Sequence, residues 1–249
     1  MNLVLCSHGT ASPAGQAAVA SLVSAVACRS SDEVVPAFVD VHGPYVGDVV
    51  TSDSVVVPLL LGDGYHVNVD IAAAVAASPG AIGTRALGPD TRITRLLLER
   101  LRAVGATRKD LLFLAAAGSS EEAADAAVRR TARELSIRCG SPVTVAYGAS
   151  RSPSLADEVV RLRAAAPHRR IVAVSYLLAS GHFHQKVLDC GADLVTEPLL
   201  TTHRPVDERL VELVLSRASV AGGQVWRGVR GLRDATVTVN CSAFGPVQT

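Results

Sequence analysis

Residues 2–10 read Asn2-Leu3-Val4-Leu5-Cys6-Ser7-His8-Gly9-Thr10, an apolar run that ends on a histidine, a glycine and a small hydroxyl residue. A short apolar run closed by glycine is typical of a buried parallel strand that enters a loop at its carboxyl end. In open α/β sheets, ligands bind at that end of the strands. The stretch therefore predicts a strand over 3–6 and places His8 where a functional site would lie.

Strand and helix patterns alternate through the first half of the chain. Residues 55–61 are β-branched and continuously apolar, as expected of a strand that is covered on both faces. Residues 91–104 carry apolar side chains on one stripe, which predicts an amphipathic helix. The full pattern predicts strands at 3–6, 34–39, 55–61 and 81–87, and helices at 14–28, 65–77 and 91–104. Such alternation predicts a parallel sheet with helices on both faces.

The same alternation starts again after a short polar linker at 105–110. His8-Gly9-Thr10 aligns with Ala117-Gly118-Ser119 at a shift of 109 positions, and 57–61 aligns with 174–178 at a shift of 117. Gly88-Pro89 aligns with Glu197-Pro198, again at 109. The second half predicts strands at 111–115, 143–147, 171–178 and 194–197, and helices at 121–136, 152–166, 183–189 and 206–217.

These repeats predict an α/β protein of two similar lobes that are related by internal duplication. Each lobe is expected to be a four-stranded parallel sheet with helices on both faces, in a flavodoxin-like strand order. We expect an N-terminal lobe over 1–106, a C-terminal lobe over 107–220, and a tail over 221–249 that is loose or forms a small hairpin from 224–227 and 236–240. Two such lobes should face each other across a cleft.

The composition narrows the class of protein. The chain has 249 residues, of which 49% are hydrophobic and 19% charged, with a mean hydropathy of +0.31, so it can bury a substantial core. The net charge of +1 argues against a nucleic-acid partner. No apolar run is long enough for a membrane span, and no signal peptide is expected. The five cysteines are scattered without a C-x-x-C pair, which indicates reduced thiols and a cytoplasmic protein.

A second histidine follows the third predicted strand of the first lobe. That strand runs into Gly62-Asp63-Gly64-Tyr65-His66, so His66 lies just past its carboxyl end. Because the first and third strands are neighbours in a doubly wound sheet, His8 and His66 should meet. Two imidazoles can bind a divalent transition metal and accept protons near neutral pH. Asp70, four residues after His66, is placed to hold the other N–H of that imidazole.

Simpler interpretations exist for most of these residues. His8 alone would be an ordinary loop histidine, His66 an ordinary helix residue, and Asp70 part of a solvated helix face. Asp40 and His42 lie near Pro44, where turn chemistry explains them.

The second lobe lacks the histidine pair. Ala117 stands at the position of His8 and Phe183 at that of His66. Phe183 is flanked by His182 and His184, which either reach into the cleft or are exposed. His168 and His203 lie in polar stretches and are expected at the surface.

At 5–10 and again at 60–70, the chain resembles the sirohydrochlorin chelatases of the SirB/CbiX type, which are class II chelatases. The family pattern is a strand followed by [S/A]-H-G-[S/T] and, some 55 residues later, a strand followed by G-x-H-V-x-x-D. Both parts are present in order and spacing. The resemblance covers about 1–218, extends to the duplicated long form of the family, and implies a chelatase-like fold.

The resemblance implies insertion of Fe²⁺ or Co²⁺ into sirohydrochlorin, which yields sirohaem or a cobalamin precursor. His8 and His66 match the family histidines that hold the metal and take protons from the pyrrole nitrogens. The metal is then a substrate, and no permanently bound cofactor is expected, an iron–sulfur cluster least of all. One chain can form the cleft unaided, so a monomer suffices.

Further residues are candidate substrate contacts. Sirohydrochlorin carries many carboxylates, so arginines at the cleft rim should hold it. Arg151, after the second strand of the second lobe, is the candidate arginine. The other candidates are Thr10, Tyr65, His182 and His184.

Two alternatives remain open. A histidine phosphatase also carries a strand that ends in H-G-x-[S/T], but it needs an arginine just before the histidine, where this chain has Ser7. A non-catalytic carrier of tetrapyrrole or metal needs the same binding residues without turnover. The sequence does not decide between iron and cobalt, because metal supply competes with the intrinsic preference of imidazole ligands.

Overall fold

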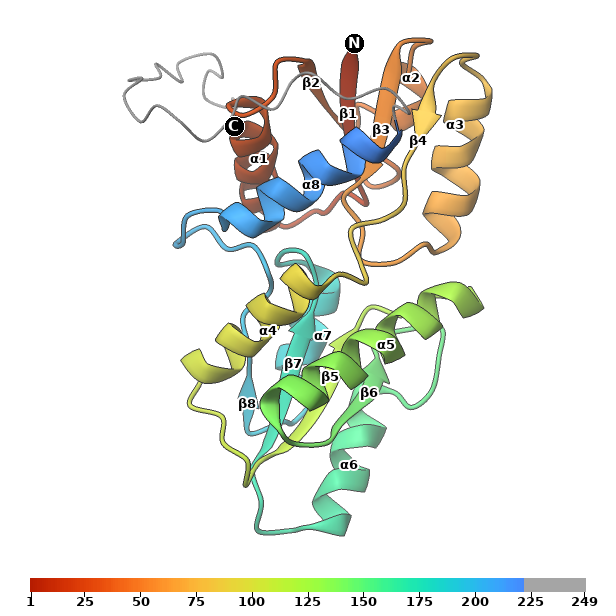
Figure 1. The fold of residues 1–249 in the computed structure, drawn as a ribbon. Coiled ribbons are helices and arrows are strands. Elements are labelled where there is room, and N and C mark those ends of the chain that lie inside the picture. The colour runs from red at the N-terminus through yellow and green to blue at the C-terminus, as the bar shows by residue number, and fades with distance from the viewer. Residues whose placement is uncertain (222–249) are drawn as a thin grey trace, which may run out of the picture.

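The computed structural model describes residues 1–221 and folds them into two lobes, each built on a four-stranded parallel sheet (Figure 1). The first lobe has the strand order β2-β1-β3-β4 and the second β6-β5-β7-β8. The predicted α/β class, with two parallel sheets and flavodoxin-like order, is confirmed. The proposed hairpin at 224–227 and 236–240 lies outside the described residues.

The first half of the chain forms β1 (Asn2–Ser7), α1 (Pro13–Ala27), β2 (Glu33–Phe38), α2 (Val46–Val49), β3 (Ser54–Pro58), the π-helical turn η1 (Val67–Ile71), α3 (Ala72–Ala76), β4 (Ile82–Gly83) and α4 (Thr91–Ala103). The second half forms β5 (Leu111–Ala116), α5 (Glu122–Cys139), β6 (Val143–Tyr147), α6 (Leu155–Ala165), β7 (Ile171–Tyr176), α7 (His182–Leu188), β8 (Leu194–Val195) and α8 (Glu208–Ala221).

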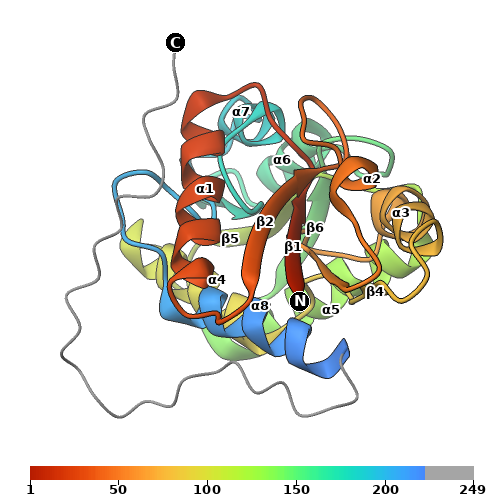
Figure 2. The ribbon, with the colours of Figure 1, turned by 90° about the horizontal axis from the view of Figure 1, so that it is seen from above.

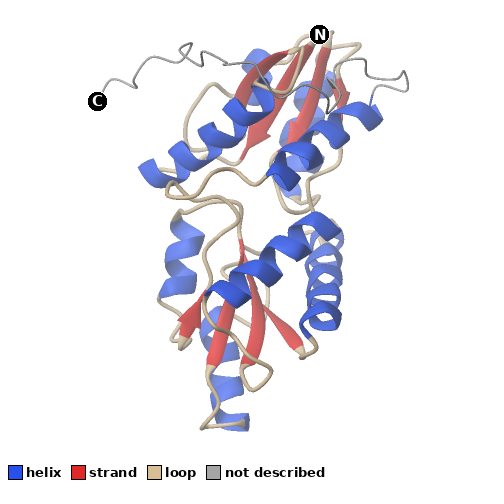
Figure 3. Cartoon of the chain, turned by 60° about the vertical axis from the view of Figure 1, so that its left-hand side comes forward, coloured by secondary structure: helices blue, strands red, loops and turns tan. Residues whose placement is uncertain are grey.

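Alternation along β1 explains why helices cover both faces of the first sheet. Leu3 and Leu5 belong to the apolar cluster under α1 and α8, whereas Val4 and Cys6 belong to the cluster under α2 and α3. Successive side chains of a strand point to opposite faces, so a continuously apolar strand needs cover on both. Figure 2 shows α1 and α3 on opposite sides of this sheet, and Figure 3 shows the two sheets one above the other.

The strand register confirms the duplication. Leu3 pairs with Val55 across β1 and β3, and Leu112 pairs with Val172 across β5 and β7, which reproduces the shifts of 109 and 117. The first-lobe helix begins at Tyr65 and α7 begins at His182, again 117 apart.

One predicted alignment is wrong. Val55 pairs with Ile82, and its counterpart Val172 pairs with Leu194, so the fourth strands are related by a shift of 112 rather than 109. The alignment of Gly88-Pro89 with Glu197-Pro198 rests on a proline that both segments contain, whereas the backbone pairing of the fourth strands gives a different shift. The fourth strands are also shorter than predicted, because each is an edge strand that pairs through only two residues.

The last helix of each half packs on the opposite lobe. The α4 helix contacts α5 and β7, and α8 contacts α1 and β3 (Figure 1). Arg209 of α8 forms a two-pronged ion pair with Glu99 of α4, with both N···O distances 2.7 Å. The predicted boundary near residue 106 therefore remains a prediction about the repeats in the sequence, while in space the two halves exchange their final helices.

No helix among residues 1–221 combines the length and apolarity that a membrane crossing requires.

Candidate functional site

His8 and His66 meet at the carboxyl edge of the first sheet. The β1 strand ends at Ser7, so His8 is the next residue, and β3 lies beside β1 with Cys6 opposite Pro58. The chain then turns into the helix that begins at Tyr65 and carries His66. The two imidazole centroids are 4.7 Å apart, with their planes at 87°. Two residues separated by 58 positions in the sequence thus form one imidazole pair.

The contacts of both rings fix their tautomers. Nδ1 of His8 lies 3.3 Å from the carbonyl oxygen of Gly9, and Nδ1 of His66 lies 2.6 Å from Oδ2 of Asp70. A carbonyl and a carboxylate oxygen only accept, so each Nδ1–H is the hydrogen-bond donor, and in the neutral form of each ring the lone pair is on Nε2. Among the described residues, neither Nε2 has a hydrogen-bond partner.

Gly9 allows the sharp turn after His8. Its φ is +92°, and a Cβ there would stand 2.2 Å from the carbonyl oxygen of Asp40. The N–H of Asp40 in turn donates to the carbonyl oxygen of His8 over 3.0 Å. Gly118 repeats this turn in the second lobe, with φ +97°. The loop geometry has therefore been kept in both lobes, and only the first retains the histidine.

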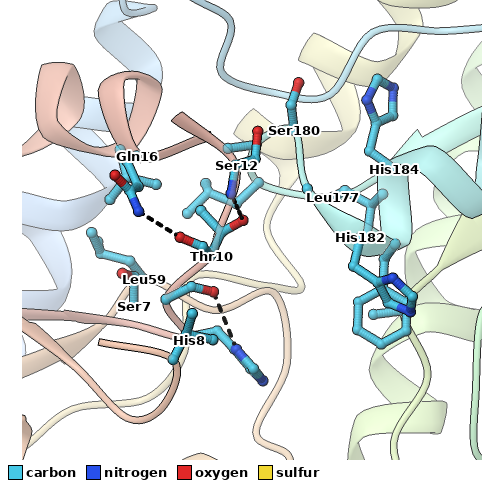
Figure 4. A pocket seen from close by; sticks show the side chains of 18 of the residues that line it. Ser7, His8, Thr10, Ser12, Gln16, Leu59, Leu177, Ser180, His182 and His184 are labelled. Atoms are coloured by element: carbon cyan, nitrogen blue, oxygen red, sulfur yellow. Dashed lines mark hydrogen bonds between the residues drawn. The ribbon is translucent and has the colours of Figure 1, made fainter. Parts of the chain in front are cut away.

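Two neighbouring pockets lie between the lobes. The α1 pocket, of about 460 Å³, is lined by the start of α1 and by the segment 176–184 (Figure 4). The α5 pocket, of about 360 Å³, is lined by the start of α5 and by the segment 60–66. Because the two pockets share part of their lining, they are two ends of one cleft. The shared lining residues are His8, Leu60, Leu61, Ala117, Tyr176 and Phe183. His66 lines the α5 pocket but not the α1 pocket.

The two pockets are related by the internal repeat. Thr10 of the first lobe abuts Gly181, where a Cβ would be 2.9 Å from the threonine Oγ1. Its counterpart Ser119 abuts Gly64, where a Cβ would be 3.0 Å from the serine Oγ. Thr10 and Ser119 differ by 109 positions, and Gly64 and Gly181 by 117. These pseudo-symmetric contacts bring the two lobes together at two equivalent places.

The predicted contacts Thr10 and Tyr65 lie at the cleft. The Thr10 hydroxyl accepts the N–H of Ser12 at 3.1 Å, and its carbonyl oxygen accepts the Gln16 amide at 2.8 Å, so this loop is fixed against α1 (Figure 4). Tyr65 is exposed and lines the α5 pocket, with its ring centroid 5.7 Å from that of His66.

His182 and His184 both line the α1 pocket from α7 (Figure 4). His182 is exposed. Burial lowers the pKa of His184 from its ordinary value, although a hydrogen bond to the backbone of Thr196 opposes the shift. Nε2 of His184 is buried without a hydrogen-bond partner in the described chain.

The Arg151 guanidinium contacts groups of its own lobe. Its Nε donates to the carbonyl oxygen of Ser119 at 2.7 Å, its Nη2 donates to that of Ser120 at 3.0 Å, and its Nη1 lies 3.7 Å from Asp125. The guanidinium therefore holds its own lobe together. Of the described residues that line the two pockets, none is a lysine or an arginine.

A buried acidic group borders the α5 pocket on the second lobe. Burial raises the pKa of Asp125, but hydrogen bonds from Tyr147 and Arg129 outweigh it and hold that pKa below its usual range. Burial of the Tyr147 hydroxyl and its hydrogen bond to Asp125 raise the pKa of Tyr147 to about 12. Asp125 is thus an ionised, fully engaged carboxylate.

The remaining histidines divide between cleft and surface. His42 lines the α1 pocket, with its ring 4.1 Å from that of Phe38 and its Nε2 buried without a partner in residues 1–221. His168 and His203 are exposed, and His203 contacts Glu197 at 2.8 Å. The Asp40 carboxylate accepts the N–H of Val41, a local turn contact.

The sequence does not predict Phe183 or Tyr176 as site residues, although both line the two pockets. For Phe183, the shift of 117 positions that pairs it with His66 is the signal in the sequence.

Across residues 1–221, no three or more His, Cys, Asp or Glu side chains come together as a metal site. Ser7 also stands where a histidine phosphatase needs its phosphate-binding arginine.

Comparison with known proteins returned one family and a set of similar folds. The CbiX family model matches residues 2–104 and 111–218. The structure titled SirB from Bacillus subtilis with Fe³⁺ is 18% identical, with a TM-score of 0.71 over 90% of this chain and 98% of that chain. The sirohydrochlorin chelatase SirB from Bacillus subtilis subspecies spizizenii in complex with cobalt is 17% identical, with a TM-score of 0.64 over 92% and 99%.

A third structure is titled CbiX, the terminal enzyme for biosynthesis of siroheme in denitrifying bacteria. It is 15% identical, with a TM-score of 0.61 over 87% of this chain and 99% of that chain. At these identities the structures establish the shared fold. A comparison with curated protein sequences gave no match.

Proposed function

The chain belongs to the CbiX family, whose model matches both of its repeats, and on that premise we propose that the protein inserts a divalent metal ion, Fe²⁺ or Co²⁺, into sirohydrochlorin. The observation that carries the proposal is the His8–His66 pair, with ring centroids 4.7 Å apart at the cleft. Structures of the same fold with Fe³⁺ and with cobalt, and one named for siroheme biosynthesis, support the choice of metal and substrate.

In the proposed reaction, the Nε2 lone pairs of His8 and His66 hold the incoming ion at the α5 pocket, which both histidines line. Each ion that enters the macrocycle replaces two pyrrole N–H protons. As the metal–nitrogen bonds form, the ion leaves the imidazoles, and their Nε2 atoms become free to accept those two protons. A neutral imidazole suits this task because its ordinary pKa lies near neutral pH.

A small number of protein ligands fits an enzyme that gives its metal away. A site closed by four protein ligands retains its ion, whereas two imidazoles leave coordination positions for the pyrrole nitrogens. Asp70 has a supporting role in this proposal. By accepting a hydrogen bond from Nδ1–H of His66, Asp70 keeps the Nε2 lone pair directed toward the ion.

The test follows sirohydrochlorin absorbance under anaerobic conditions with Fe²⁺ or Co²⁺. Wild-type protein should insert metal faster than the spontaneous rate, and His8→Ala and His66→Ala should bring the rate back to that background. His168→Ala is the matched control, because that histidine is exposed and lies outside both pockets. Histidine variants that insert metal as fast as wild type would refute this mechanism.

The absorbance assay and a phosphatase assay together separate the alternatives. Binding of sirohydrochlorin and metal without turnover would indicate a carrier, and hydrolysis of a generic aryl phosphate would indicate a phosphatase. The ratio of kcat/KM for Fe²⁺ to that for Co²⁺, measured in one buffer, decides the metal preference.

A further inference from the structure

We propose that Phe183 forms the wall against which the planar face of the tetrapyrrole packs, so that the macrocycle lies between this ring and the His8–His66 pair. This inference rests on the proposed function and adds a residue that positions the substrate. It assigns the second lobe a task of its own, the binding of the face that the metal does not approach.

Phe183 occupies the structural position of His66. Both are the second residue of a helix that begins just past the central strand of its lobe, at Tyr65 and at His182. The paired registers of β1 with β3 and of β5 with β7 fix this equivalence at a shift of 117. The repeat therefore presents an imidazole from one lobe and a phenyl ring from the other at matching places of the cleft.

The phenyl ring lies in the part of the cleft that both pockets share. His8 and Phe183 belong to the lining of the α1 pocket and to that of the α5 pocket. Ala117, at the position of His8, adds no bulk beside the phenyl ring. A flat ligand that spans both pockets thus meets nitrogen donors on one lobe and an apolar wall on the other.

The surroundings of Phe183 fix the orientation of its ring. A Cβ at Gly148 would stand 2.8 Å from Cδ1 of Phe183, so the ring needs the space that a glycine leaves. Nζ of Lys186 donates to the carbonyl oxygen of Gly148 at 3.0 Å and lies over the ring, 5.5 Å from its centroid. The ring of His182 meets it edge-on at a centroid distance of 5.5 Å. A ring held in this way loses little freedom when a ligand packs on it.

The charge of the cleft favours the same assignment. None of the described lining residues is a lysine or an arginine, whereas the shared part of the lining includes Leu60, Leu61 and Phe183, which offer apolar and aromatic contact to the face of a macrocycle. Aromatic rings pack on flat conjugated systems in offset-stacked or edge-on geometry.

The test measures the Kd of metal-free sirohydrochlorin by absorbance titration and then the KM values for tetrapyrrole and for metal. Phe183→Ala should raise the Kd and the tetrapyrrole KM about 10-fold, in line with the loss of one aromatic stacking contact. The KM for metal should stay unchanged. Phe183→Trp, which keeps a flat face, should bind close to wild type, and Phe183→Leu, which keeps apolar volume without the face, should fall between. Leu188→Ala is the matched control, because Leu188 is exposed on the same helix.

A Kd for Phe183→Ala within twofold of wild type would overturn the stacking proposal and leave the chelatase proposal standing. A parallel rise in the KM for metal would also overturn it, since the ring would then act on the histidine pair. If wild type binds sirohydrochlorin without inserting metal, the chelatase proposal fails while the titration still decides the role of Phe183. Should Phe183→Ala fold poorly, the comparison of the leucine and tryptophan variants gives the same decision.

Discussion

The Tyr176 hydroxyl donates a hydrogen bond of 2.9 Å to the carbonyl oxygen of Leu61, and this bond joins the end of β7 in the second lobe to the loop that leads to His66. Thr131 in turn lies 3.4 Å from the Tyr176 oxygen. Complete burial raises the pKa of Tyr176 to about 12, so the hydroxyl keeps its proton across the working pH range. The shared floor of the two pockets is therefore fixed by one bond between the lobes.

Tyr176→Phe should remove this bond and leave the Leu61 carbonyl without its donor. The expected cost is about 1–2 kcal/mol of unfolding free energy, measured by chemical denaturation. Tyr45→Phe, at an exposed tyrosine, should cost nothing measurable. An unchanged stability of Tyr176→Phe would show that the contact does not hold the lobes together.

Gly9→Ala should be destabilising because the backbone there is left-handed and the added Cβ meets the Asp40 carbonyl at 2.2 Å. The strain of the left-handed conformation alone costs about 1–2 kcal/mol, and His8 should be displaced as well. Gly47→Ala is the control, since a Cβ there meets nothing within 4 Å. The melting temperature and the rate of metal insertion should both fall for Gly9→Ala, and neither should change for Gly47→Ala.

Asp70→Asn should lower metal insertion by about 10- to 100-fold, which is the usual effect of losing a carboxylate that orients a metal-binding histidine. The loss should be smaller than that of His66→Ala, because the imidazole itself remains. Initial rates at varied metal concentration measure it, with the exposed Asp48→Asn as control. Rates equal to wild type would show that the Asp70 contact with His66 has no part in metal insertion.

Acid should destabilise the fold through Asp90. This residue caps α4 and accepts hydrogen bonds from the Arg92 backbone and side chain, each at 2.9 Å. Burial opposes ionisation of Asp90, but the Arg92 contacts outweigh it and hold the pKa below its usual value. A lowered folded-state pKa contributes stability that is present above the ordinary pKa, about 4, and is lost as the pH falls through the folded value.

Asp90→Asn keeps a capping side chain and removes the charge. It should therefore be less stable than wild type at pH 7, by about 1–2 kcal/mol, and should lose less on acidification. Melting temperatures between neutral pH and about pH 3 measure the difference, and parallel curves for the two proteins would contradict the expectation.

The sequence predicted the histidine pair because its position follows from general rules. Apolar strands next to each other in a doubly wound order bring their carboxyl ends together, so His8 and His66 had to meet. The partners of Arg151 could not be predicted, since an arginine near a cleft binds whichever acceptors the fold leaves closest. The Ser119 and Ser120 carbonyls lie in a loop of a different strand, and no local pattern marks them.

Helix placement shows the other limit. The periodicity of 91–104 identified an amphipathic helix, but an apolar stripe does not state which sheet it will cover. Both sheets offer similar apolar faces because they are copies of one another, and α4 packs on the second lobe instead of its own. The shift of 112 between the fourth strands likewise depends on the ladder, which a shared proline obscured.

The packing of α4 and α8 on the opposite lobes suggests how the duplicated chain arose. A single half would expose the apolar surface that the other half's final helix covers. Its own final helix would have no surface to pack on. Two identical halves could bury these surfaces by forming a dimer in which each packs its final helix on the other. Joining two copies of the gene would then keep, within one chain, an interface that first formed between separate molecules.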